Sequence, residues 1–142
     1  MTLRASLVCL RDGRLMSEVC SINTISYVVS QWAANEPLIR RIYLYGSRAR
    51  GDHRPNSDID LAIFYNVDLE ILSYYRRNVP IAQKMHNARR GTWNENAASW
   101  VAALEARLPV RVHIESVERT FKRVWPSLKQ CRILLYRRGV SA

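Results

Sequence analysis

The sequence predicts one α/β (or α+β) domain in which helices flank a small sheet of about four strands. The continuous apolar run at 59–64 is typical of a strand buried on both faces at the centre of a helix-covered sheet. Alternating apolar and charged residues over 110–115 predict another strand, which has one apolar face and one polar face. Apolar residues at helical spacing over 23–35 predict a helix. With 142 residues, the chain is long enough for one core but not for two.

The first half of the chain divides at residue 22. Residues 1–22 predict an N-terminal extension, which could form a short hairpin, and 23–142 predict the domain itself. Within the domain, local patterns predict a first strand, a turn with a short helix and a second strand at 42–45, 46–51 and 58–65.

The second half is predicted to be mainly helical. Asp68 is expected to cap a helix that Pro80 kinks or restarts, and Thr92 with Glu95 forms a capping box that predicts a new helix start. A helix over 117–125 is expected to stop at Pro126, and the last strand is expected at 131–136.

Composition narrows the class of protein. The net charge of +10 and the pI near 10.2 favour a polyanionic or acidic partner. The three cysteines are widely spaced, which indicates neither a disulfide framework nor a zinc site. No apolar run approaches the roughly 20 residues of a membrane helix. We therefore expect a soluble protein of the reducing cytoplasm, without membrane contact.

The chemistry is expected between the first two strands. Gly46 lets a backbone approach a phosphate closely, and Ser47 offers a hydroxyl and an amide where a helix starts. Asp58 and Asp60, two residues apart on a strand, point to the same face and suit Mg²⁺, which binds carboxylates together with substrate phosphates. Arg48 and Arg50 could face the same phosphates. The stretch therefore predicts a site for a nucleoside triphosphate with Mg²⁺.

Gly46-Ser47, ten residues and then Asp58-x-Asp60 resemble the Gly-Ser-x10-Asp-x-Asp pattern of the DNA polymerase beta nucleotidyltransferase superfamily. The likeness is to its small prokaryotic branch, the minimal nucleotidyltransferases. It covers about 25–136, and its specific part is confined to 46–60. The resemblance implies a polymerase-beta-like core with a mixed sheet, and it implies transfer of a nucleoside monophosphate in which Asp58 and Asp60 are catalytic and hold the metal.

The superfamily uses a third carboxylate, and here the sequence departs from the pattern. The branch often carries an aspartate just after the first valine of the corresponding strand, whereas this chain has Val110-Arg111. Glu115 is the candidate third catalytic and metal-binding carboxylate, since strand parity puts it on the face of Arg111 and His113. Substitution by His113 and the absence of any replacement both stay open.

Three functions remain open. Proteins that this one resembles are often antitoxins paired with a HEPN ribonuclease toxin, and some adenylylate a tyrosine of that partner, which implies AMP transfer from ATP to a protein within a hetero-oligomer. A small-molecule acceptor, as in aminoglycoside nucleotidyltransferases, is a second possibility. Those enzymes usually bind the acceptor with a further helical domain, and here a partner subunit of a homo-oligomer would have to supply that wall of the acceptor site. A weak or inactive module could instead neutralise a partner by occlusion or bind RNA.

Overall fold

A computed structural model of the protein describes residues 20–73, 79–118 and 120–139. The expected N-terminal hairpin within 1–22 thus lies outside the described residues, except for 20–22. In the described parts, no helix is long and apolar enough to cross a membrane. The helices are α3 (Ile22–Ala34), α4 (Ser47–Arg50), α5 (Leu69–Ser73), α6 (Ile81–Glu105) and α7 (Phe121–Gln130), and the strands are β1 (Ile39–Tyr45), β2 (Ile59–Tyr65), β3 (Val112–Ser116) and β4 (Ile133–Arg137).

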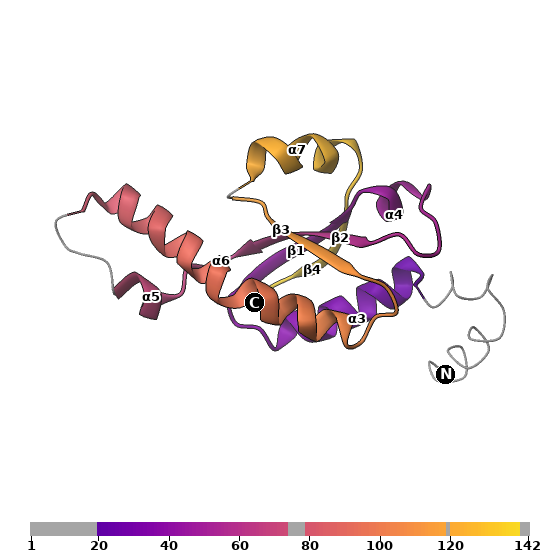
Figure 1. Cartoon of the computed structure of the whole chain (residues 1–142), viewed down its shortest axis with the longest axis horizontal. Coiled ribbons are helices and arrows are strands. Elements are labelled where there is room, and N and C mark those ends of the chain that lie inside the picture. The colour runs from indigo at the N-terminus through magenta and orange to yellow at the C-terminus, as the bar shows by residue number, and fades with distance from the viewer. Residues whose placement is uncertain (1–19, 74–78, 119, 140–142) are drawn as a thin grey trace.

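The strands form one mixed sheet in the order β3-β2-β1-β4. Strand β1 is antiparallel to both β2 and β4, whereas β2 and β3 are parallel. Helices α3 and α6 lie on one side of the sheet and α7 lies on the other (Figure 1). The predicted fold class, a small mixed sheet flanked by helices, is therefore confirmed.

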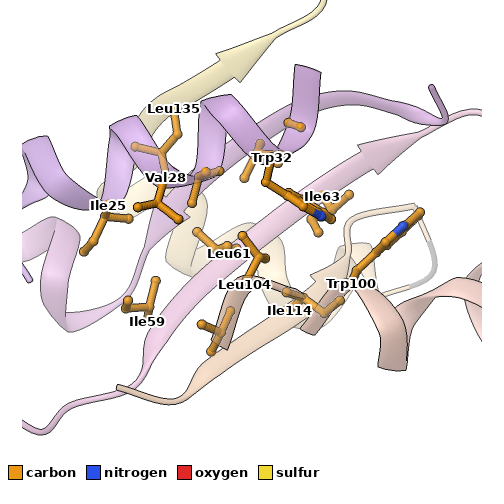
Figure 2. Close-up of a cluster of buried hydrophobic side chains, with 14 of the residues drawn as sticks. Ile25, Val28, Trp32, Ile59, Leu61, Ile63, Trp100, Leu104, Ile114 and Leu135 are labelled. Carbon is orange, nitrogen blue, oxygen red and sulfur yellow. The ribbon is translucent and has the colours of Figure 1, made fainter. Parts of the chain in front are cut away.

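The two faces of β2 have different neighbours. Ile59, Leu61 and Ile63 are fully buried and belong to the core under α3 and α6, beside Trp32 and Trp100 (Figure 2). The opposite face carries a smaller core, which consists of Tyr45, Ala62, Val117, Val124 and Leu128. Since side chains alternate along a strand, Asp60 shares the α7 face with Ala62. The site described below therefore lies between the sheet and α7.

The capping box predicted a helix start at Thr92, and this prediction is wrong. Helix α6 is continuous from Ile81 to Glu105, and Thr92 is completely buried in its middle. The Thr92 hydroxyl donates to the Ala88 carbonyl at 2.8 Å and accepts from the Asp68 backbone N–H at 2.9 Å. The hydroxyl therefore joins the start of α5 to α6, a tertiary contact that outweighs the local capping pattern.

Pro126 does not stop α7, and the expected helix over 117–125 is displaced. Helix α7 begins at Phe121 and continues through Pro126 to Gln130. Val117 instead stays with the sheet, where its N–H donates to the Ile63 carbonyl at 3.2 Å. Proline removes one hydrogen bond from the ladder, but the burial of Val124 and Leu128 holds both halves of the helix against the sheet.

Candidate functional site

The turn between β1 and α4 depends on glycine. Gly46 has φ of +77°, a conformation that side-chain-bearing residues rarely adopt. A Cβ at this position would lie 2.5 Å from Asp60 Oδ2, because Tyr45 and Asp60 are paired across β1 and β2. The predicted glycine turn therefore lies directly against the predicted carboxylate.

We expect Gly46→Ala to damage the site more than Gly51→Ala does. Both glycines have positive φ, so both substitutions should cost about 1–3 kcal/mol of backbone strain. Only at Gly46 does the new methyl group meet the Asp60 carboxylate, since no atom lies within 4 Å of the corresponding position at Gly51. Magnesium-dependent binding of ATP, measured by calorimetry, should be lost in Gly46→Ala and kept in Gly51→Ala. Equal binding by the two variants would contradict the close packing of Gly46 and Asp60.

A hollow of about 410 Å³ brings most of the predicted site residues together. It lies between the ends of β1, β2 and β3 and helix α7. Its lining contains five predicted site residues, namely Gly46, Ser47, Arg50, Asp60 and Glu115, together with Tyr45, His113, Arg123, Val124 and Ser127. Asp58 and Arg48 are not in this lining, so the hollow does not contain all of the predicted site residues.

The two aspartates differ in environment. Burial raises the pKa of Asp60, and the Asp58 carboxylate raises it further, against the lowering effect of His113. The Asp58 side chain is 43% exposed, and its Oδ1 lies 3.7 Å from Nε of Arg111, a side chain that is itself 83% exposed. A carboxylate that resists ionisation next to a second carboxylate is stabilised by a bound cation. Asp58 and Asp60 therefore fit Mg²⁺ as a pair of oxygen ligands.

Arg48 does not occupy the predicted position at the phosphates. It is 1% exposed, and its guanidinium donates to the backbone carbonyls of Cys20, Pro55 and Ser57 at 2.8–3.2 Å. All three guanidinium nitrogens take part, so phosphate contact would require breaking these bonds. Arg48 instead ties the loop that ends at Asp58 to the start of α3, a role that depends on tertiary contacts.

Arg50, at the end of α4, also lines the hollow. Its Nε is 3.1 Å from Asp52 Oδ2, and both side chains are partly exposed. Exposed ion pairs contribute only about 0–1 kcal/mol, so this contact leaves Arg50 able to turn toward an anion.

Glu115 lies in the hollow, where its carboxylate contacts Arg123 and His113. Its Oε1 accepts from Arg123 Nη2 at 2.8 Å, and its Oε2 is 2.7 Å from His113 Nε2. Among residues 20–73, 79–118 and 120–139, no group of three or more His, Cys, Asp or Glu is arranged to hold a metal ion. The arrangement places Glu115 beside His113, the residue that pairs with Asp60 across β2 and β3.

Sequence patterns did not identify the wall that α7 contributes. Arg123 and Ser127 line the hollow from this helix, while Val124 between them is buried. Arg123 was not identified as a site residue, because a local pattern does not show what lies opposite a helix. Tyr45 was also missed: burial raises the pKa of its hydroxyl, and the Asp60 and Glu115 carboxylates raise it further, so the phenol stays protonated as a hydrogen-bond donor.

Comparison with known proteins agrees with the motif. Residues 29–90 match the family model described as "Polymerase beta, Nucleotidyltransferase". The matched stretch contains the glycine turn and both aspartates, whereas β3 and α7 lie outside it. This part of the chain is thus similar to that family, and the similarity favours nucleotidyl transfer in general terms. Such domains generally use Mg²⁺.

Other comparisons add little. A crystal structure from Sulfolobus solfataricus, of a protein described as a candidate nucleotidyltransferase, is similar to this chain with 17% sequence identity. The alignment covers 96% of this chain and 87% of that one, and the TM-score is 0.36, a likeness too weak to assign an activity. No curated protein matches the sequence.

Proposed function

We propose that the protein is a Mg²⁺-dependent nucleotidyltransferase that moves AMP from ATP onto a hydroxyl group of a partner protein. One observation carries the proposal: the Asp60 carboxylate lies against the Gly46 turn in a hollow that also contains Ser47 and the cationic side chains of Arg50 and Arg123. AMP as the transferred group and a HEPN-type toxin as the acceptor follow from the resemblance of the motif to minimal nucleotidyltransferases.

Each part of the hollow has a chemical task in such a transfer. The acceptor oxygen forms a bond to the α-phosphorus, the bond to the bridging oxygen breaks, and pyrophosphate leaves while the hydroxyl proton passes to a base or to water. Asp58 and Asp60 would hold Mg²⁺, which when bound neutralises charge on the phosphates. The Gly46 backbone and the Ser47 hydroxyl would lie along the triphosphate, and Arg50 would balance its negative charge.

Glu115 acts in this proposal through Arg123. Its carboxylate accepts from Arg123 across the gap between β3 and α7, and it also contacts His113. A guanidinium that is held at a fixed point by a carboxylate loses little further entropy when it binds a phosphate. Glu115 therefore serves to position Arg123 at the hollow rather than to bind the metal.

The test is transfer of label from α-labelled ATP in the presence of Mg²⁺. The full chain is incubated with and without the product of the adjacent gene, and the acceptor is identified by gel and mass spectrometry. We expect label on a hydroxyl side chain of the neighbouring protein. Label on a small molecule would replace the proposed acceptor class, and the absence of label with any acceptor would contradict the transferase proposal.

Glu115→Gln separates the two roles considered for this residue. The amide oxygen of glutamine still accepts from Arg123, so a positioning role predicts transfer reduced by no more than about 10-fold, whereas loss of a base typically costs about 10²–10⁴. Arg123→Ala should reduce the rate of transfer at least as much as Glu115→Gln does. If Glu115→Gln is as inactive as Asp60→Asn, Glu115 is a third catalytic carboxylate after all, as the strand parity had suggested.

A second candidate is a nucleotide-binding module with little or no catalysis. It is favoured by one observation, the engagement of Glu115 by Arg123 and His113, which leaves the aspartate pair without a third carboxylate in the described part of the chain. This candidate predicts magnesium-dependent binding of ATP and co-purification with the neighbouring protein, without transfer of label.

A further inference from the structure

Two large aromatic side chains are exposed on the outer side of α7. Phe121 is 50% exposed and Trp125 is 38% exposed. Their rings stack on one another, with centroids 5.2 Å apart and planes inclined by 16°. The residues are four positions apart, so they lie one above the other along the helix. The pair is therefore a flat apolar surface presented to solvent.

The stretch of chain that carries this surface is basic. Between Phe121 and Arg138 the chain contains six basic residues and no acidic residue. Lys122 and Lys129 are exposed, and neither forms an ion pair with a carboxylate among the described residues. Lys129 continues the line of Phe121 and Trp125 by another helical turn. Lysines without a carboxylate partner beside exposed rings favour an anionic ligand.

The sheet beside α7 continues the same pattern. The Arg41 guanidinium lies 4.4 Å from the centre of the Phe64 ring, and that of Arg132 lies 5.8 Å from the centre of the Tyr43 ring. Tyr43 and Phe64 pack against the core that contains Val124 and Leu128, which places them next to α7. Alternation of aromatic rings and cations thus extends from the helix onto the sheet.

We propose that Phe121, Lys122, Trp125 and Lys129, here called the α7 surface, bind single-stranded nucleic acid. Unpaired bases would stack on the rings and the lysines would contact phosphates, the combination that sequence-tolerant single-strand binding uses. A duplex hides the faces of its bases, so it fits the surface less well. The binding is independent of nucleotidyl transfer.

The place of α7 gives the proposed binding a consequence. Arg123, on the same helix, lines the hollow that contains Asp60. With Phe121 and Lys122 it also lines a second hollow of about 530 Å³, whose acidic member, Glu118, is paired with Arg89. A strand on the α7 surface would therefore lie next to the nucleotide site without occupying it.

The experiment is fluorescence anisotropy with a labelled single-stranded RNA of about 12 nucleotides, a length within the range of known single-strand sites. The full chain should bind it more tightly than a duplex of equal length. Phe121→Ala with Trp125→Ala should weaken binding by about 10-fold or more. Lys122→Gln with Lys129→Gln should reduce the slope of log affinity against log salt by roughly 0.7 for each phosphate that a lysine no longer neutralises.

Matched controls come from the opposite side of the sheet. Tyr27, on α3, is 58% exposed, and Arg90, on α6, is exposed as well, so Tyr27→Ala and Arg90→Gln should bind as the wild type does. Asp58→Asn with Asp60→Asn should also bind normally, which separates this surface from the transferase site. Normal binding by the aromatic variant, or equal affinity for single and double strands, would overturn the proposal. Circular dichroism would verify that the variants are folded.

Discussion

Asp60→Asn should lower nucleotidyl transfer by at least about 10², the loss typical of removing one electrostatic contact to the transition state. Asparagine has nearly the same shape as aspartate, so it fits beside Gly46. The space there is tight, since a Cβ added at Gly46 would lie 2.5 Å from Asp60 Oδ2. The substitution therefore removes the negative charge while the turn keeps its geometry. Asp58→Asn should act in the same direction, since the Asp58 carboxylate lies close enough to Asp60 to raise its pKa. The measurement is the initial rate of label transfer from ATP.

We expect Asp60→Asn to keep or raise the stability of the fold, although it lowers the activity. Burial and the neighbouring Asp58 raise the pKa of Asp60, so the charged carboxylate opposes folding when no cation is bound. The melting temperature of Asp60→Asn should equal or exceed that of the wild type, and Mg²⁺ should no longer raise it in the presence of ATP. Asp52→Asn is the matched control, because Asp52 is 63% exposed and pairs only with Arg50 in the salt bridges of the described residues. Magnesium-dependent binding that survives in Asp58→Asn with Asp60→Asn would refute the assignment of the metal site.

Arg48→Ala should reduce the free energy of unfolding by about 3 kcal/mol and lower the melting temperature by roughly 10 °C. The substitution leaves the carbonyls of Cys20, Pro55 and Ser57 without their shared donor. Each unsatisfied buried acceptor typically costs about 1–3 kcal/mol. Because the Ser57 carbonyl immediately precedes Asp58, magnesium-dependent ATP binding should weaken too.

Two variants sharpen this prediction. Arg48→Lys should recover only part of the stability, since one ammonium cannot reproduce the fork that reaches all three carbonyls. Arg50→Ala, two positions further along α4, should change the free energy of unfolding by less than about 1 kcal/mol, because Arg50 forms only a partly exposed pair with Asp52. A melting temperature for Arg48→Ala equal to that of Arg50→Ala would show that the buried guanidinium does not hold the loop.

Patterns of burial could be predicted well from the sequence. The uninterrupted apolar run of β2 correctly indicated a central strand, and the alternation before Glu115 correctly indicated a further strand, β3. Periodicity reports which side chains are removed from water, and that property belongs to each segment almost independently of the others. The ends of the helices were predicted less well. The local patterns predicted a helix start at Thr92 and a helix stop at Pro126, and contacts with neighbouring segments outweigh both local preferences.

By itself, the sequence determined the glycine turn and the placing of Asp58 and Asp60 at the start of a buried strand, the features on which the proposed chemistry rests. These features depend on spacing within 46–60, where chain geometry leaves little freedom. Only the tertiary structure decided the partners of Arg48, Glu115 and Arg123. A guanidinium or a carboxylate binds whichever groups the fold brings within about 3 Å, and here those groups come from segments far away in the chain. That is why Arg48, which was predicted to bind phosphate, secures a loop in the structure, and why the contact of Glu115 with Arg123 could not be predicted.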